Sequence, residues 1–381
     1  MRYIAREASE ILASYARWFP VVALTGPRQS GKATLARKIF ASKPYVSMED
    51  ANNQRRALDD PAGFLANFPQ GAIIDEVQRT PALFTELQGL VDRRGRKGDF
   101  ILTASQQFGL LDSITQSLAG RVGMLQLMPL SRRESPLNSL ERTLWKGGYP
   151  VLHSDINDDG QYAWFNSYVT TYVERDVRSV LAVADLAQFR RFLLMCAARA
   201  GQLLNLNGLA ADCGITHTTA RRWLTVLEAS YIVFLLQPYH RNFGKRLSKS
   251  PKLYFRDSGL LCHLLGIEQP NAMATHAMRG AVFENWVIGE TIKYRWNRGL
   301  RADIYFWRDN HGNEIDLVFE HEGRLHGVEV KSGMTYASDW VRNLARWQAH
   351  IGQEAGAAAV VYGGGESFGI SAARVLSWQT M

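Results

Sequence analysis

Short apolar runs alternate with helix-like stretches over the first third of the chain. The runs at residues 21–24, 45–48, 71–76 and 99–107 have the length of buried strands, and the last two end in acidic or polar residues. Apolar residues at near-helical spacing precede the first run, and a helix is expected to begin after it near Leu35. This alternation predicts an α/β fold with a parallel sheet, whose ligands bind at the carboxyl ends of the strands.

A helix-rich pattern fills the middle of the chain. Between residues 163 and 200, apolar residues recur every three or four positions, which predicts helices that form a lid or linker. Residues 206–227 are typical of a helix-turn-helix, in which Gly214 makes the left-handed turn and Thr216 caps the second helix. Together with the strand-like run 231–237 and the basic hairpin after it, this segment predicts a winged helix.

The pattern changes again after residue 271, where a new unit of helices and strands begins. A helix is predicted first, then three strand-like runs and a last apolar run before a turn. These segments are residues 280–290, 302–307, 314–319, 325–331 and 357–362.

A glycine-rich motif lies between the first predicted strand and the helix after it. Its spacing G-x-x-x-x-G-K fits a P-loop, in which the glycines let backbone N–H groups face one anion and the lysine reaches the outer phosphates. The next position, usually a Ser or Thr that binds magnesium, is Ala33. Thr34 does not replace it simply, because one step along a helix turns the side chain by about 100°. The predicted nucleotide-binding residues are Gly26, Pro27, Arg28, Gln29, Ser30, Gly31, Lys32, Ala33 and Thr34.

Acidic and polar residues end the third and fourth predicted strands. Asp75 is expected to hold a magnesium ion, directly or through water, and Glu76 to polarise the attacking water. Ser105 and Gln106 are candidate sensors of the terminal phosphate, or part of a turn that ends the strand. Arg121 is either a charge stabiliser for the nucleotide of a neighbouring subunit or a surface arginine; the first alternative implies a homo-oligomer.

Composition and charge narrow the class of protein. The 381 residues are 46% hydrophobic and 21% charged, as in ordinary globular proteins, and the net charge of +8 favours an anionic partner, nucleic acid first. The three cysteines are widely spaced and form neither a zinc pattern nor a disulfide framework. The sequence shows no signal-peptide core and no apolar run of membrane-spanning length. We therefore expect a cytoplasmic protein that has no membrane association.

Several motifs occur in a fixed order along nearly the whole chain, at residues 26–32, 74–78, 102–107, 117–122, 147–150, 172–177 and 249–259. Together they resemble a large prokaryotic group of AAA-type ATPases whose long C-terminal half was catalogued as a domain of unknown function. Ala33 and Ala104 depart from that group, which usually has Thr and Gly at these positions. The motifs imply ATP and Mg²⁺ as cofactors.

Charged residues of the last unit form the pattern D…E-x-K on adjacent predicted strands. Period-two alternation places Glu329 and Lys331 on one face, where carboxylates can bind magnesium and the lysine can orient water. The pattern resembles the core of restriction-endonuclease-like nucleases, and Glu284 matches their helix-borne acid. It implies Asp316, Glu329 and Lys331 as catalytic residues and Glu284, Asp316 and Glu329 as metal ligands, or else an inactive copy of such a site.

Basic residues outline a nucleic-acid surface, with DNA as the expected partner. They lie on the second helix of the predicted helix-turn-helix and on the hairpin after it, where aromatic residues are interleaved. The alternatives are a winged helix that contacts protein and a hairpin that is merely solvated. The predicted contacts are Arg221, Arg222, Arg241, Lys245, Arg246, Lys249 and Lys252.

The chain is thus expected to have four parts. They are an AAA-type P-loop ATPase core at 1–140, a helical lid or linker at 141–200, a winged helix at 201–270 and a restriction-endonuclease-like α/β domain at 271–381. The leading interpretation is an ATPase that engages DNA. The alternatives are a nucleotide-dependent DNA-binding or scaffold protein with weak hydrolysis, favoured by Ala33, and a magnesium-dependent DNA nuclease regulated by ATP.

Overall fold

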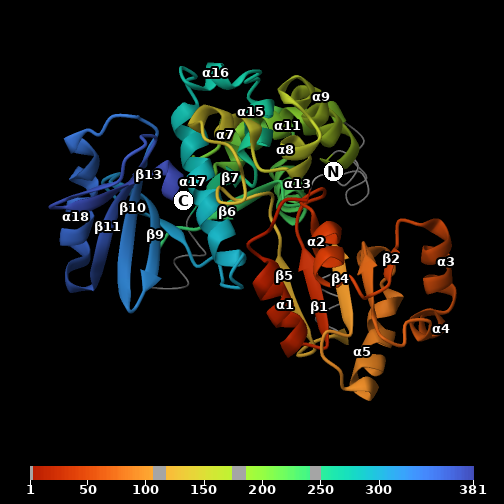
Figure 1. Cartoon of the computed structure of the whole chain (residues 1–381). Coiled ribbons are helices and arrows are strands. Elements are labelled where there is room, and N and C mark those ends of the chain that lie inside the picture. Colours follow the sequence, from red (N-terminus) through yellow and green to blue (C-terminus); the bar gives the residue numbers. More distant parts are fainter. Residues whose placement is uncertain (1–2, 106–116, 174–185, 241–249) are drawn as a thin grey trace.

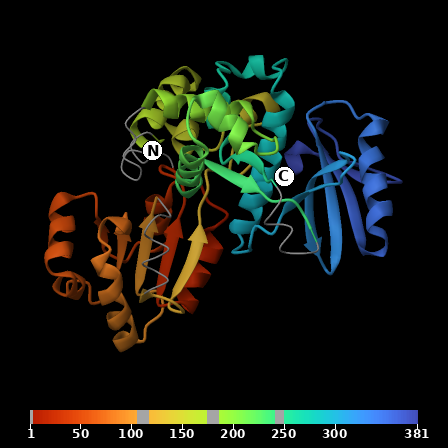
Figure 2. The same cartoon turned by 180° about the vertical axis from the view of Figure 1, so that it is seen from behind.

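The two larger β-sheets lie at opposite ends of the molecule, and helices from the middle of the chain lie between them (Figure 1). The computed structural model describes residues 3–105, 117–173, 186–240 and 250–381. Figure 2 shows the same arrangement from behind. Of the helices in these ranges, none is long and apolar enough to cross a membrane.

The first sheet has five parallel strands in the order β2–β3–β4–β1–β5. Its strands are β1 (Val21–Thr25), β2 (Tyr45–Ser47), β3 (Ala72–Asp75), β4 (Phe100–Ala104) and β5 (Val122–Gln126). Every residue of β1 is buried, because a parallel sheet of this kind is covered on both faces. The predicted parallel sheet is confirmed.

Helices cover both faces of this sheet. On one face lie α1 (Ser9–Trp18) and α2 (Lys32–Ile39), and on the other lie α3 (Ala51–Asp59), α4 (Pro61–Ala66) and α5 (Ala82–Arg94). Neighbouring residues of β1 divide between the two faces: Val21 packs in the core that contains Phe84, and Val22 packs in the core that contains Leu35. This alternation follows from the period of two along a strand.

The middle unit, residues 137–273, is mostly helical. It contains α7 (Leu140–Lys146), α8 (Pro150–Ser154), α9 (Asp158–Tyr168), α11 (Leu186–Ala198), α12 (Leu206–Cys213), α13 (His217–Ala229), α15 (Ser258–Leu264) and α16 (Pro270–Met273). Gly214 between α12 and α13 has φ +67°, and the Thr216 hydroxyl caps α13 by accepting from Thr219 N. The antiparallel pair β6 (Val233–Leu236) and β7 (Lys252–Phe255) follows α13. These elements lie where the sequence places the winged helix, which stays a prediction.

The last unit, residues 279–381, begins with the long helix α17 (Arg279–Trp296) and continues as a six-stranded mixed sheet in the order β12–β13–β11–β10–β9–β8. Val360 packs on the side of α18 and Val361 on the side of α17, so the two helices cover opposite faces of the sheet. The strands β12 and β13 were not predicted from the sequence. The elements are β8 (Tyr305–Arg308), β9 (Glu314–His321), β10 (Arg324–Lys331), α18 (Arg342–Ile351), β11 (Ala355–Tyr362), β12 (Phe368–Ile370) and β13 (Ala373–Ser377).

One hydrophobic core joins the middle unit to the last unit. It runs from Leu140 through the helices of the middle unit and α17 to Trp378. The core therefore crosses the positions 200 and 270, where the sequence predicts domain boundaries. These boundaries remain predictions, and the two units pack as one body.

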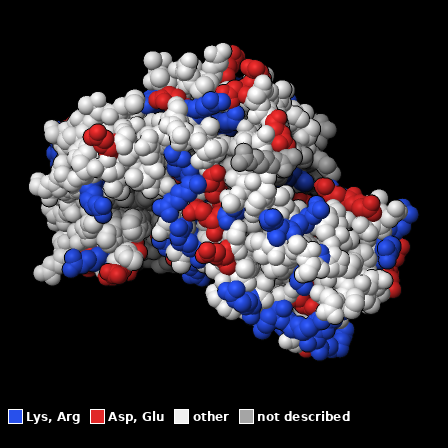
Figure 3. All heavy atoms as spheres, viewed as in Figure 1, with Lys and Arg blue, Asp and Glu red and all other residues white. Residues whose placement is uncertain are grey.

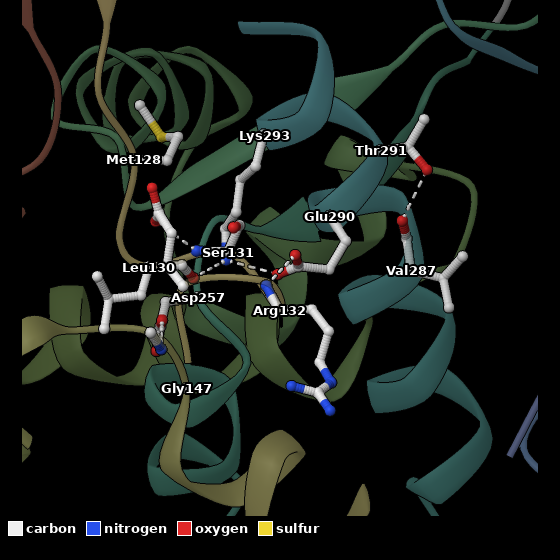
Figure 4. Close-up of polar contacts among 12 residues, drawn as sticks. Met128, Leu130, Ser131, Arg132, Gly147, Asp257, Val287, Glu290, Thr291 and Lys293 are labelled. Carbon is white, nitrogen blue, oxygen red and sulfur yellow. Dashed lines mark hydrogen bonds and ion pairs between the residues drawn. The ribbon is translucent and has the colours of Figure 1, made fainter. Parts of the chain in front are cut away.

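Buried polar groups join the segment after β5 to α17 (Figure 4). The backbone N–H of Arg132 donates to Glu290 Oε2 at 2.7 Å, and the ammonium group of Lys293 donates to the carbonyl of Leu130 at 2.9 Å. Glu290 and Lys293 also form a buried ion pair at 2.8 Å. Since buried charges are stable only when paired and hydrogen-bonded, this network fixes the first domain against the last unit.

The side chain of Asn285 on α17 ties this helix to β7, and its removal is expected to destabilise the protein. Its Oδ1 accepts from Phe255 N at 2.6 Å and its Nδ2 donates to Phe255 O at 2.9 Å, both buried. Asn285→Ala leaves both backbone groups unpaired, so we expect the free energy of unfolding to fall by about 2–4 kcal/mol in urea denaturation. Asn166→Ala, an exposed position on α9, is the control; equal stability of the two variants would contradict the prediction.

Candidate functional site

The loop between β1 and α2 has the backbone geometry of a phosphate cradle. Gly26 and Gly31 have φ values of +148° and +93°. A Cβ atom at Gly26 would lie 2.1 Å from the carbonyl oxygen of Leu127, so only glycine fits there. Because α2 begins at Lys32, its first N–H groups point into the loop. The backbone is thus arranged to bind an anion such as a phosphate.

Lys32 is buried in this loop and is 5% exposed. Its ammonium group donates to the carbonyls of Gly26 at 2.9 Å and Pro27 at 2.7 Å. Burial lowers the pKa of Lys32 to about 8, while the negative charges of Glu76 and Asp75 act to raise it. The two predicted acids therefore lie close enough to the loop to act on its lysine.

The strand order brings Ser105 beside Glu76. Because β4 lies between β1 and β3, the residues that follow β3 and β4 share the edge of the sheet that carries the loop. The Ser105 hydroxyl donates to Glu76 Oε1, and Gln78 Nε2 donates to Oε2. Both oxygens of this buried carboxylate are held in place. Gln106, the second candidate sensor, lies outside the described residues.

Asp75, the predicted magnesium ligand, is held by two hydroxyl groups that the sequence did not single out. Thr103 Oγ1 donates to its Oδ1, and Tyr45 OH donates to its Oδ2 at 2.7 Å. Each carboxylate oxygen keeps a second lone pair. Ala33 in the first turn of α2 offers only a methyl group, so the residues present fit a magnesium ion held by Asp75, phosphate oxygens and water.

Arg6 supports the loop from the segment before α1. The guanidinium group, 6% exposed, donates to the carbonyls of Ser30 at 2.7 Å and Met128 at 2.6 Å. Its Nε lies 3.0 Å from Glu134 Oε2, which forms a buried ion pair. Sequence reasoning missed this residue, because a single arginine ahead of a helix belongs to no motif.

A cavity of about 460 Å³ opens beside the loop. Apolar side chains form much of its wall, with the ring of Tyr3 among them, and its size suits a small organic ligand. The lining residues are Tyr3, Ile4, Arg6, Gln29, Gly31, Thr34, Leu130, Pro150 and Val151. The cavity thus extends from the phosphate loop to the start of α8.

Tyr231 links the loop to the middle unit. Tyr231 is only 1% exposed, and its hydroxyl group donates to Thr25 Oγ1 at 2.9 Å. The residue has φ +58°, which is uncommon for a bulky side chain. It lies just after α13, so the end of this helix connects to the first residue of the loop. The sequence placed Tyr231 only at the start of a strand.

Arg121 lies at the opposite edge of the first sheet. In the register of β1 with β5, Val122 pairs with Val21 and Gln126 with Thr25, so Arg121 is roughly 15 Å from the start of the loop. Its guanidinium group forms an exposed ion pair with Asp92 at 2.6 Å. It cannot reach the nucleotide site of its own subunit, and its role toward a neighbouring subunit stays a prediction.

The predicted nucleic-acid contacts divide into three groups. Arg221 and Arg222 are exposed on α13, as expected. Lys252 requires a correction: it is 4% exposed and is paired with Glu284 at 3.0 Å and Glu314 at 2.5 Å, because β7 is a buried strand. The remaining four, Arg241, Lys245, Arg246 and Lys249, lie outside the described residues.

Surface charge in the view of Figure 3 does not single out one broad basic face. Lys and Arg side chains are interspersed with Asp and Glu where the first sheet approaches α17, and a basic group lies at the lower end of the first domain. The green part of the middle unit, which includes α13, lies toward the viewer in Figure 2, the side opposite to that of Figure 3. The exposed arginines of α13 therefore remain the best-defined candidates for phosphate contacts.

The predicted D…E-x-K residues come together in the last unit. Asp316 Oδ2 accepts from Val330 N at 2.8 Å, and Lys331 pairs with Glu329 at 2.5 Å. Burial, with the negative charge of Glu329, raises the pKa of Asp316 to about 7. These contacts hold the two carboxylates and the lysine on adjacent strands, as the sequence pattern indicates.

Glu284 on α17 joins the same cluster, but together with a second lysine. Its Oε1 accepts from Lys252 Nζ and from Tyr254 OH. Burial, with the nearby charge of Asp316, raises the pKa of Glu284 to about 7. Across the described ranges of the chain, no group of three or more Asp, Glu, His or Cys side chains is arranged to hold a metal ion. The cluster, as it is arranged, does not fit the predicted metal site.

Three families match successive parts of the chain. An AAA domain matches residues 19–135, a domain of unknown function (DUF8612) matches residues 137–271, and another domain of unknown function (DUF4143) matches residues 279–381. The first part is therefore a P-loop AAA-type ATPase domain, in agreement with its parallel sheet and phosphate loop. The other two matches indicate no function.

Two relatives from mycobacteria match most of the chain. The uncharacterized proteins Rv2008c of Mycobacterium tuberculosis and Mb2031c of Mycobacterium bovis are each 36% identical to this chain, over 87% of its length and 74% of theirs. Among solved structures, the Walker-type ATPase of Pyrococcus abyssi is 13% identical over 69% of this chain and 96% of that chain, with a TM-score of 0.47 that supports no conclusion. The sequence relatives decide the assignment: the chain belongs to the family of AAA-domain proteins that includes Rv2008c.

Proposed function

We propose that this protein binds ATP at residues 25–34, hydrolyses it slowly, and uses the nucleotide to regulate how its middle unit engages DNA. The proposal rests on one observation: Lys32, Asp75 and Glu76 lie near one another at the carboxyl edge of one parallel sheet. A phosphate cradle, a cation and two carboxylates at one edge are the parts that nucleotide hydrolysis needs.

Each part of the site has a chemical role in this proposal. The backbone N–H groups of the loop and the Lys32 ammonium bind the phosphates, and Glu76 polarises the attacking water. Ser105 and Gln78 orient the Glu76 carboxylate through their hydrogen bonds. Magnesium, when bound with the nucleotide, neutralises phosphate charge. Asp75 would hold it without the usual hydroxyl ligand, which is the reason to expect slow turnover.

The cavity beside the loop supplies a place for the rest of the nucleotide. Its apolar wall and the ring of Tyr3 suit the flat face of a base, while Thr34 and Gly31 border the phosphate end. Pro150 and Val151 come from the middle unit, so a bound nucleotide would touch both units. This arrangement supports a nucleotide that changes the contacts between the loop and the start of α8.

DNA engagement is the second half of the proposal. Arg221 and Arg222 are exposed on the second helix of the helix-turn-helix, the position from which such helices contact DNA. The hydrogen bond from Tyr231 to Thr25 connects this helix to the loop. A scaffold protein that binds ATP without hydrolysing it is the second candidate, favoured by Ala33.

Assembly and compartment complete the proposal. Because Arg121 is out of reach of its own loop, any part that it plays in hydrolysis would be toward the nucleotide of a neighbouring subunit in a homo-oligomer. The described cysteines Cys196, Cys213 and Cys262 are buried and free, which fits a reducing compartment such as the cytoplasm.

Restoring the missing hydroxyl should increase hydrolysis. We expect the wild-type protein to show magnesium-dependent ATP turnover, Ala33→Thr to raise kcat several-fold, and Glu76→Gln to lower it by about 10²–10⁴-fold while ATP still binds. Lys32→Ala should remove both binding and turnover. Absence of magnesium-dependent turnover in the wild type and in Ala33→Thr, with ATP still bound, would favour the scaffold alternative.

Nucleotide affinity should fall as the pH rises through the pKa of Lys32. The buried lysine loses its proton near pH 8, and phosphates favour the charged form, so binding takes up a proton above that pH. Between pH 7.5 and 9 we expect the Kd for a non-hydrolysable ATP analogue to increase roughly tenfold in calorimetry. Lys43→Met should keep this dependence and Lys32→Met should lose it; a pH-dependence that survives Lys32→Met would contradict the assignment.

Removing the Tyr231 hydroxyl should weaken the coupling between nucleotide and DNA. Tyr231→Phe keeps the ring and deletes one buried hydrogen bond, worth about 1 kcal/mol. We therefore expect the ratio of DNA affinities with and without the ATP analogue to shrink about fivefold, measured by fluorescence anisotropy. Tyr162→Phe, an exposed ring, is the control. If the ratio of DNA affinities is unchanged in Tyr231→Phe, the Tyr231 hydrogen bond does not couple nucleotide binding to DNA binding.

A further inference from the structure

The buried acidic cluster of the last unit contains a cation that comes from another part of the chain. Glu284 on α17 and Glu314 on β9 face the ammonium group of Lys252 on β7. We propose that this cluster is a receptor for Lys252, which joins the middle unit to the last sheet, and that the lysine occupies the place where a nuclease of the predicted kind would bind a divalent ion. This inference goes beyond the proposed ATPase and does not depend on it.

The contacts of Lys252 are those of an internal counter-ion. Its Nζ lies 3.0 Å from Glu284 Oε1 and 2.5 Å from Glu314 Oε1, and the side chain is 4% exposed. The ring of Phe306 lies 5.6 Å from the ammonium group on another side. An ammonium group has three donors and no acceptor, so two carboxylates and a ring face satisfy it away from water.

A second residue of β7 reinforces the same contact. Tyr254 OH donates to Glu284 Oε1 at 2.5 Å. Residues two apart on a strand point to the same face, so Lys252 and Tyr254 reach Glu284 together. One carboxylate oxygen of Glu284 is therefore shared by two donors from the middle unit.

The other carboxylates of the cluster also have partners within the chain, although Glu329 Oε1 is buried without a hydrogen bond among the described residues. Asp316 accepts from the backbone of Val330 at 2.8 Å, and Glu329 pairs with Lys331 at 2.5 Å. A hard divalent ion requires several carboxylate or carbonyl oxygens turned toward one point. Here Glu284 and Glu314 face Lys252, Glu329 faces Lys331, and Asp316 accepts from the backbone. This agrees with the lack of a three-ligand group in the described ranges.

Backbone contacts beside the cluster support its role as a junction. The chain after β6 runs along β8, where Phe306 N donates to Gln237 O at 3.1 Å and Tyr239 N donates to Phe306 O at 2.6 Å. The β6–β7 pair is thus joined to the last sheet by main-chain bonds and by Lys252. A buried ion pair contributes little net stability but is costly to break on one side, which suits a contact that selects one docking geometry.

The experiment compares metal binding and stability of the full-length protein without nucleotide. Manganese binding is measured by electron paramagnetic resonance. The melting temperature is measured with and without about 5 mM Mn²⁺, a concentration that suits a weak site. We expect the wild type to bind no manganese at this cluster, so Asp316→Asn should leave its manganese binding unchanged. In Lys252→Met we expect a melting temperature lower by several degrees, a partial recovery with manganese, and loss of that recovery in the double variant with Asp316→Asn.

Two controls keep the test decisive. Lys97→Met removes an exposed lysine and should leave the melting temperature unchanged, and Lys252→Arg should keep more stability than Lys252→Met because it retains a cation. A wild-type manganese site that Asp316→Asn abolishes would overturn the proposal, and this measurement does not require that Lys252→Met folds. Equal stability of Lys252→Met and Lys97→Met would overturn it as well.

Discussion

The buried guanidinium group of Arg6 is the contact on which the nucleotide site depends. It bonds to the backbone of the phosphate loop at Ser30 and to the segment after β5 at Met128, and Glu134 neutralises it. A charge buried in this way must keep all its partners, so the loop, the first segment of the chain and the segment after β5 hold one another in place. Gly26, whose backbone lies against Leu127, needs that constraint for its close approach.

The same segment after β5 carries this constraint into the rest of the molecule. Its backbone is bonded to Glu290 and Lys293 of α17, and α17 packs in the core that the middle and last units share. The ATPase domain is therefore attached to the other units through buried charges rather than through a flexible linker. Tyr231 adds a second attachment at the loop itself, so a change in the loop can reach α13 and α17 by separate routes.

Local patterns in the sequence predicted the parts of the structure that depend on local physics. The alternation of strands and helices, the glycines of the loop and the turn at Gly214 follow from periodicity and from backbone freedom, and the structure has them. Arg6, Tyr231 and Lys252 could not be placed in this way, because their partners lie 24, 206 and 32 residues away. Lys252 was misjudged for a physical reason: a basic hairpin predicts exposure, whereas the end of that hairpin enters a buried strand beside acids.

The position of Arg6 bears on how the ATPase domain could be divided from the rest. The matched AAA domain begins at residue 19 and ends at 135, so a fragment cut at those limits would contain Ser30, Met128 and Glu134 but not the arginine that joins them. It would keep every recognisable motif of the nucleotide site but leave the Glu134 carboxylate without its cation. The matched AAA domain begins at residue 19, but the folded domain needs Arg6. The folded domain therefore begins at least 13 residues earlier than the matched sequence.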